Sequence, residues 1–318
     1  VKIQTSDNHC IALTKNASIY TWGSNTYGQL GLGIKEDNKV NEPTRCEFFI
    51  ENNIKIIYIS IGYSTTSIIT EDNNLYSSGC TQNGRIGIKI KNTNFINKFT
   101  KINIKYKISK IESGSTHQCS IDEDYHIYSW GSKYYIGSSR PWYKDSYNTN
   151  MQIYYFKNKN ILIDKISIGQ GGYHTFALSK SGLVYGWGHN GTWLLGHDNY
   201  NSSNDSSEFI HTIPVKLKKF DYKYKIKDII CGWSCTYILD YTGNIYISGQ
   251  NNEGQLGIHY SKCTYDSGKY KYLLGKHETI NNIDKIYNFK ETVFLVNFNK
   301  KVYSVGNINK YTSFTQSN

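Results

Sequence analysis

The sequence predicts an all-β protein of the β-propeller type, and two observations support this prediction. The first is the stretch 9–33, HCIALTKNASIYTWGSNTYGQLGLG, in which two apolar runs flank a polar turn and are followed by glycines. β-branched and aromatic residues bounded by Asn, Ser and Gly favour strands over helices. The second is that versions of this stretch recur along the 318 residues. Repeats of this length are typical of propellers, solenoids and arrays.

Four registers define the repeat. The glycine that ends the second strand, here called the strand-end glycine, recurs at intervals of 52 to 61 residues as Gly23, Gly79, Gly131, Gly188, Gly249 and Gly306. Fourteen residues before each of them lies a residue that we call the anchor: His9, Thr65, His117, His174, Cys235 or Thr292. Three residues before the anchors stand Ser6, Gly62, Gly114, Gly171, Gly232 and Phe289. Eight residues after the strand-end glycine, a closing glycine follows at Gly31, Gly87, Gly196 and Gly257.

These registers predict one propeller domain over residues 1–318. Its repeat units run over about 1–51, 52–107, 108–160, 161–222, 223–280 and 281–318. Unit four is the most regular, whereas residues 258–280 of unit five are interpreted as a polar insertion. Unit six is degenerate, and only 12 residues follow Gly306, which we interpret as too few for the usual outer strands.

Structural roles explain most of the recurring residues. Glycine before the anchor lets two backbones approach closely and turn sharply. A His at the anchor position hydrogen-bonds neighbouring backbone, so a structural role is favoured over a catalytic one for His9, His117 and His174. Large apolar side chains are expected to fill the space between blades, namely Trp22, Trp130, Trp187, Leu30, Leu195 and Leu256.

The net charge of +11 has two interpretations. Lysines could attract an acidic partner such as nucleic acid, an acidic protein or a membrane surface. Alternatively, they reflect the codon bias of an AT-rich genome and coat solvent-facing strands. The densest basic run, residues 216–227, would form a nucleic-acid patch if its lysines gather on one surface: Lys216, Lys218, Lys219, Lys223, Lys225 and Lys227.

The cysteines and the known catalytic motifs give no sign of a cofactor or an active site. Seven scattered cysteines, an odd number, suit a reducing compartment and therefore an intracellular location, either nuclear or cytoplasmic. Cys231 and Cys235 have no second pair, so no metal is predicted. No P-loop, nucleophile elbow or HExxH motif occurs, and the acidic residues 122–124 stand where a hairpin turn belongs. The sequence has no run of about 18 apolar residues, so no membrane span is predicted.

The motifs His-x-x-Ala-Leu-Thr, Ile-Tyr-Thr-Trp-Gly-Ser-Asn and Tyr-Gly-Gln-Leu-Gly-Leu-Gly resemble the repeats of the regulator-of-chromosome-condensation (RCC1-like) family. The resemblance covers nearly the whole chain and is weakest in unit six. It implies a seven-bladed propeller, whereas six units are visible here. We therefore expect either a seventh unit outside this stretch of sequence or a six-unit variant whose ring is imperfectly closed.

The resemblance also implies two functions. The founding member is a guanine-nucleotide exchange factor for the Ran GTPase and docks on nucleosomes, whereas many relatives use the repeats as protein-docking modules in larger chains. In the family, the exchange face includes acidic and His residues in the loops just before the anchors. Here only Asp7 and Glu291 are acidic in these loops, so the docking module is favoured and exchange on a Ran-type GTPase, with chromatin association, is the alternative. The candidate contact residues are Asp7, Asn8, Tyr63, Thr116, Tyr173, Trp233 and Glu291, with Trp142 and Tyr143 as further exposed aromatic candidates.

Overall fold

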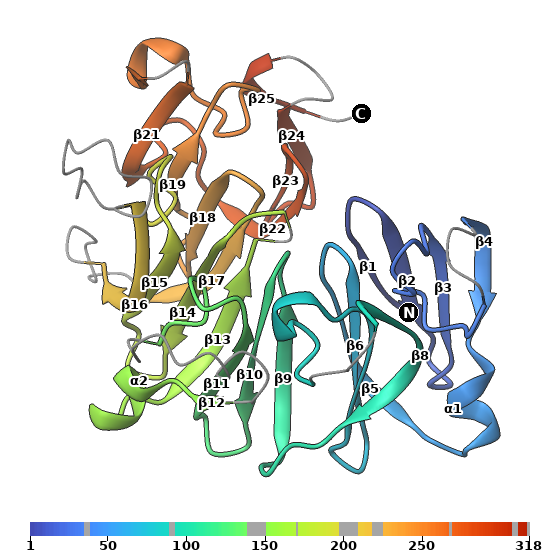
Figure 1. Cartoon of the computed structure of the whole chain (residues 1–318). Coiled ribbons are helices and arrows are strands. Elements are labelled where there is room, and N and C mark those ends of the chain that lie inside the picture. The colour runs from blue at the N-terminus through green and yellow to red at the C-terminus, as the bar shows by residue number, and fades with distance from the viewer. Residues whose placement is uncertain are drawn as a thin grey trace. The chain divides into compact units, whose positions relative to one another are not determined.

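The computed structural model describes residues 1–34, 39–88, 93–138, 151–169, 171–196, 209–217, 225–266, 269–306 and 311–316. Within these residues the chain forms six antiparallel sheets, here called blades one to six in chain order (Figure 1). Each blade begins with three consecutive strands that pair with their neighbours in sequence, and an outer strand follows. The all-β prediction is confirmed.

The chain divides into two compact units of three blades each, Val1–Ile163 and Asp164–Asn318. Blade one consists of β1 (Lys2–Thr5), β2 (His9–Leu13), β3 (Ile19–Gly23) and β4 (Val40–Arg45). Blade two consists of β5 (Ile56–Ile61), β6 (Thr65–Thr70), β7 (Leu75–Cys80) and β8 (Phe95–Ile102). Blade three consists of β9 (Ile108–Ser113), β10 (His117–Asp122), β11 (Ile127–Gly131) and β12 (Met151–Gln152). Short helices α1 (Glu47–Glu51) and α2 (Tyr154–Asn158) follow β4 and β12, and the 3-10 turn η1 (Gln82–Gly84) follows β7.

The second unit repeats the arrangement. Blade four consists of β13 (Ile163–Ile168), β14 (His174–Ser179), β15 (Val184–His189) and β16 (Ile210–Lys216). Blade five consists of β17 (Ile226–Cys231), β18 (Cys235–Asp240), β19 (Ile245–Gln250), β21 (Lys269–Lys276) and β20 (Thr264–Asp266). Blade six consists of β22 (Ile283–Phe289), β23 (Thr292–Asn297), β24 (Val302–Gly306) and β25 (Tyr311–Gln316). The 3-10 turn η4 (Tyr260–Lys262) precedes β20.

Two sequence interpretations of the outer strands are wrong. Blade six has a fourth strand, β25, which pairs with β24, so 12 residues after Gly306 suffice for an outer strand. Residues 258–280 contain β20 and β21, and β21 pairs with β19 as the outer strand of blade five. An outer strand has a wet face and few apolar residues, so its sequence resembles that of a polar loop.

The six strand-end glycines share one conformation that explains why the repeat needs them. Each has a φ between +99° and +114° and pairs with its anchor, as Gly188 does with His174. A Cβ added to Gly188 would lie 2.3 Å from the Tyr173 carbonyl oxygen, and a Cβ added to any of the other five glycines would lie 1.9 to 2.6 Å from the equivalent carbonyl oxygen. Both the φ and the space therefore require glycine.

Apolar side chains from neighbouring blades of one unit form the core. Trp130 packs with Ile69, Leu75 and Ile111 between blades two and three, and in the second unit Leu195 joins Ile229 and Ile238 between blades four and five. Trp187, Leu30 and Leu256 are also buried, as predicted, whereas Trp22 is only half-buried. Blade stacking thus accounts for most of the apolar repeat positions.

Candidate partner-binding loops and the anchor residues

Two loops of each blade share one edge of its sheet. The first loop precedes the anchor, and we call it the anchor loop; the second follows the strand-end glycine. In blade one the two are joined by the Ser24 amide, which donates to the Asn8 carbonyl oxygen. The same bond is made by Cys80 to Ser64 and by Gln250 to Ser234. The candidates in the anchor loops, namely Asp7, Asn8, Tyr63, Thr116, Tyr173, Trp233 and Glu291, therefore lie at this edge of their blades.

The buried anchor histidines hold adjacent blades together. His9 Nε2 lies 2.8 Å from Thr66 Oγ1 in blade two, and Thr66 Oγ1 donates to the Gln29 carbonyl oxygen in blade one. In the second unit, His174 Nε2 lies 3.1 Å from Thr236 Oγ1, which donates to the Leu194 carbonyl oxygen. The prediction that anchors bond neighbouring backbone is thus refined, because a threonine relays the contact.

Burial changes the protonation of these histidines. Desolvation lowers the pKa of His9 and of His117 from the ordinary value to about 3, because no solvent stabilises the charged ring. Both side chains are essentially inaccessible, as is His174. A group that stays neutral and enclosed between blades is suited to a structural role.

The anchor loop of blade four differs from the spacing of the repeat, which places Gly171 three residues before the anchor. The Gly62 amide donates to the carbonyl oxygen of its anchor Thr65, and in blade four this bond is made by Gly169 to His174. Gly171 lies instead under the Trp233 indole, where an added Cβ would be 2.7 Å from Cδ2. The blade-four loop is therefore longer by two residues, and the extra turn supports Trp233.

Aromatic side chains are exposed along the anchor loops. In the second unit, successive blades present Tyr173, Trp233 and Phe289, which are 42%, 42% and 39% exposed. Tyr63 is exposed in the first unit, where its carbonyl oxygen accepts a hydrogen bond from Asn8 Nδ2. Phe289 was not among the predicted contact residues. Its place at the end of β22, beside the anchor loop, was the signal that could have found it.

Polar side chains join the anchor loops of blades five and six. Gln255 Nε2 donates to Ser234 Oγ at 2.9 Å and to Glu291 Oε2 at 2.8 Å. The Ser234 hydroxyl lies 2.8 to 2.9 Å from both Glu291 carboxylate oxygens. Glu291, one of the two acidic candidates, thus receives hydrogen bonds from two other loops of this chain.

Arg85 makes the corresponding connection in the first unit. It occupies the position of Gln255 in the motif that ends at the closing glycine. Its guanidinium donates to the Ser64 hydroxyl and to the Ser115 carbonyl oxygen, and thus joins the anchor loops of blades two and three. Sequence reasoning missed Gln255 and Arg85, although their shared place in the repeat was visible.

The remaining predicted contact residues differ in exposure. Asp7, Asn8 and Thr116 are half-buried. Trp142 and Tyr143 lie outside the described residues, as do Lys218, Lys219 and Lys223 of the basic run.

The described lysines of the basic run have different surroundings. Lys216 is half-buried at the end of β16, and Lys225 lies 5.7 Å from the centre of the Tyr241 ring. Lys227 Nζ is bound 2.8 Å from an oxygen of Asp284 in blade six. The Asp284 carboxylate also binds Lys300, and these two ammonium groups lower its pKa to about 2. Part of the positive charge of this run is therefore neutralised within the chain.

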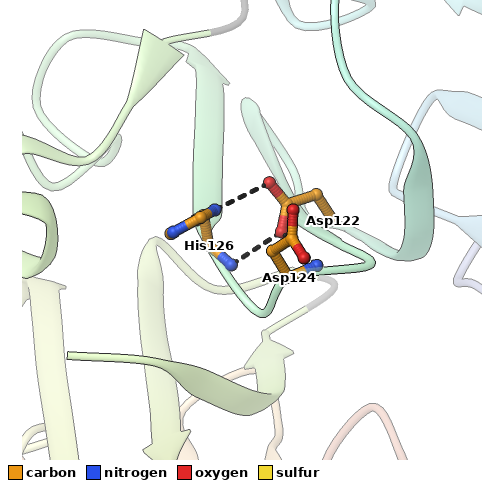
Figure 2. A group of neighbouring side chains, drawn as sticks. All are labelled: Asp122, Asp124 and His126. Carbon is orange, nitrogen blue, oxygen red and sulfur yellow. Dashed lines mark hydrogen bonds and ion pairs between the residues drawn. The ribbon is translucent and has the colours of Figure 1, made fainter. Parts of the chain in front are cut away.

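Asp122, Asp124 and His126 are the one group of potential metal ligands among the described residues (Figure 2). Asp122 Oδ1 accepts hydrogen bonds from the backbone amides of residues 124 and 126, and Oδ2 accepts from His126 Nδ1 and Tyr128 Oη. Such a turn is repeated in all six blades. In each, the side chain at the equivalent position accepts a hydrogen bond from the backbone amide four residues later: Thr14, Thr70, Asp122, Ser179, Asp240 and Asn297. The cluster is thus a hairpin turn, as predicted for residues 122–124.

All seven cysteines are free thiols. Cys231 and Cys235 form no disulfide, and burial raises the pKa of Cys235 well above its usual value. In the part of the chain that the structure describes, no helix has the length and apolar character needed to cross a membrane.

A sequence model of the RCC1-like domain matches residues 1–314, almost the whole chain. The chain belongs to the RCC1-like domain family. The predicted resemblance is thereby confirmed, and the six blades are those of an RCC1-type β-propeller.

Other RCC1-like proteins have recognisable sequence similarity. The ultraviolet-B receptor UVR8 of Arabidopsis thaliana is 30% identical over 265 residues, which cover 81% of this chain and 54% of the receptor. The RCC2 homolog of Danio rerio is 25% identical over 81% of this chain and 43% of its own length. The chain thus spans about half the length of these relatives.

Solved RCC1-like structures share the fold at low sequence identity. Prp20p of Saccharomyces cerevisiae, whose structure is described together with its binding to Gsp1p and histones, has a TM-score of 0.81 and 18% identity over all of this chain and 76% of the yeast protein. Human WBSCR16 has a TM-score of 0.79 and 16% identity, again over all of this chain and 82% of the human protein. These similarities confirm the predicted propeller architecture.

Proposed function

We propose that this RCC1-like propeller is a protein-interaction module that binds its partner through the anchor loops. The supporting observation is the series of exposed aromatic side chains at the anchor-loop edge of the three successive blades of the second unit: Tyr173, Trp233 and Phe289. Aromatic residues are enriched at the centres of protein interfaces and supply much of the binding energy there. Each blade of this unit therefore offers an exposed aromatic side chain to a partner at its anchor-loop edge.

The surroundings of Trp233 support its role as a fixed contact. Its indole lies against the Gly171 backbone, so a side chain is placed for binding before a partner arrives. The adjacent Ser234 is held by Glu291 and Gln255. Side chains that such contacts hold in place lose less conformational entropy when a partner binds.

Photo-crosslinking tests this proposal. A photoreactive phenylalanine analogue placed at Trp233 in the full-length protein should form crosslinked partner adducts in cells. The same analogue at Tyr241, exposed at the opposite edge of blade five, serves as the matched control and should form few. Equal adduct yields at both positions, or none at Trp233, would contradict binding through the anchor loops.

Guanine-nucleotide exchange is the alternative, and the structure disfavours it. The Glu291 carboxylate already accepts hydrogen bonds from Ser234 and Gln255 and is therefore less available to a GTPase. We expect no acceleration of fluorescent GDP release from a Ran-type GTPase on addition of this chain. Acceleration that Asp7→Ala abolishes, with the melting temperature of the variant unchanged, would establish exchange instead.

The nature of the partner follows from the same observations. A protein partner is favoured over nucleic acid, because Lys227 of the basic run is paired with Asp284. Prp20p, a protein of the same fold, binds Gsp1p and histones.

The free thiols suit a reducing compartment, so we place the protein inside the cell, in the nucleus or the cytoplasm.

A further inference from the structure

A concave site lies at the edge of blade three opposite to its anchor loop. It is a cavity of about 370 Å³ between the β10–β11 turn and the segment that contains α2. The lining consists of His126, Tyr128, Gln152, Phe156, Lys157, Asn160, Ile161 and Leu162. The volume is within the range of small-ligand sites, roughly 300 to 1,000 Å³.

Strand pairing and the α2 segment build this cavity. Tyr128 of β11 pairs directly with Gln152 of β12, which places both side chains on one face of the sheet. The chain then turns through α2, and the Ile163 amide returns to the Tyr125 carbonyl oxygen. Phe156 is buried and provides the apolar floor.

The polar lining favours an anion. Lys157, Gln152 and Asn160 are among the lining residues, and none of the lining residues is acidic. His126 Nδ1 is 3.0 Å from Asp122 Oδ2, and the carboxylates of Asp122 and Asp124 lie on one side of the imidazole (Figure 2). Because Nδ1 is engaged by Asp122, Nε2 is the ring nitrogen that remains for a ligand.

Aromatic and aliphatic groups line the rest of the cavity. Tyr128 stacks on Tyr106, with ring centres 3.6 Å apart, and its hydroxyl donates to Asp122 Oδ2. This side chain is thereby fixed as a wall beside Ile161 and Leu162. An anionic group with an apolar stem would satisfy both parts of the lining.

Blade one shows that the fold does not require the basic groups. Its α1 segment repeats the same bonds, since the Ile54 amide donates to the Phe49 carbonyl oxygen as that of Ile161 does to Phe156. Asn53 has the same left-handed conformation as Asn160, with φ values of 52° and 51°. The positions of His126 and Lys157, however, are Ser18 and Ile50 in blade one.

We propose that the blade-three cavity binds a carboxylate or phosphate group attached to an aromatic or aliphatic stem. Lys157 and His126 would hold the anion, while Tyr128 and Phe156 would contact the stem. Such a group can belong to a free small molecule or to the acidic side chain of a peptide. This site is separate from the anchor loops and does not depend on their function.

Binding assays with defined probes test the proposal. Phenyl phosphate and benzoate represent the free anions, blocked acetyl-Phe-Glu-amide represents the peptide, and benzyl alcohol is the neutral control. Binding is followed by NMR of ¹³C-labelled histidine rings and by the shift in melting temperature. We expect saturable binding of at least one anionic probe with a shift of the His126 resonance. If the free anions bind more tightly than the peptide, the ligand is a small molecule; if the peptide binds more tightly, the ligand is an acidic side chain.

Variants distinguish the cavity from general surface binding. Lys157→Gln should weaken binding by about tenfold, the usual effect of losing a charged hydrogen bond. Lys159→Gln should leave it within about twofold, because Lys159 is not in the lining and lies 4.1 Å from the centre of the Tyr155 ring. The double variant H126S/K157I copies blade one and should fold normally without binding. Equal affinity in this variant, equal affinity for benzyl alcohol, or no binding of any anionic probe would overturn the proposal.

Discussion

Gly188→Ala is expected to destabilise the protein far more than Gly182→Ala. Both glycines have positive φ values in blade four, 99° and 85°. Alanine at Gly182 would meet no atom within 4 Å, whereas at Gly188 its Cβ would lie 2.3 Å from the Tyr173 carbonyl oxygen. The strained φ alone costs about 1 to 3 kcal/mol, and the backbone clash at Gly188 should raise the loss to roughly 4 kcal/mol or more.

Urea unfolding followed by tryptophan fluorescence measures this difference. The Gly182→Ala protein should be recovered in soluble form with a modestly lower midpoint. Gly188→Ala should show a much lower midpoint or fail to accumulate as soluble protein. Similar midpoints for the two variants would show that the clash, and with it the explanation of the six strand-end glycines, is incorrect.

Mild acid is expected to destabilise the protein through its buried histidines. The pKa of His9 and of His117 is about 3 in the folded state, below the unfolded value of about 6.5. Below that value the unfolded chain binds protons that the folded chain excludes, so stability falls as the pH falls toward 3. Below about pH 6.5, each histidine lowers the free energy of unfolding by about 1.4 kcal/mol per pH unit, which amounts to roughly 2 kcal/mol at about pH 5.

Replacement of one histidine separates this effect from other acid effects. We expect His9→Gln to be less stable at neutral pH, because the bond to Thr66 is lost, yet to show a shallower loss of stability between about pH 6.5 and 5. Carboxylates contribute mainly below this window; Asp284, for example, has its pKa lowered to about 2. His259→Gln, which alters a histidine in an exposed pair with Ser261, is the control. An unchanged slope in His9→Gln would contradict the assignment.

The candidate site could be predicted only in part. Trp233 and Tyr173 were found because they stand beside anchors in the repeat, and they prove to be exposed. The bonds from Gln255 to Ser234 and Glu291 were not predicted, because these residues are 21 and 36 positions apart in the chain. Sequence shows that the loops recur, but not which of their side chains meet across adjacent blades.

The repeat, the order of the units and the recurrence of the strand-end glycines follow from the sequence alone. These depend on local properties: strand periodicity within a hairpin and a backbone conformation that only glycine adopts readily. The packing of adjacent blades is what brings Thr66 to His9 and Thr236 to His174, which are 57 and 62 residues apart in the chain. Tertiary structure also placed Gly169, rather than Gly171, in the blade-four turn and brought Lys157 to the cavity of His126. Such contacts depend on how separate blades and loops pack, which a local pattern does not encode.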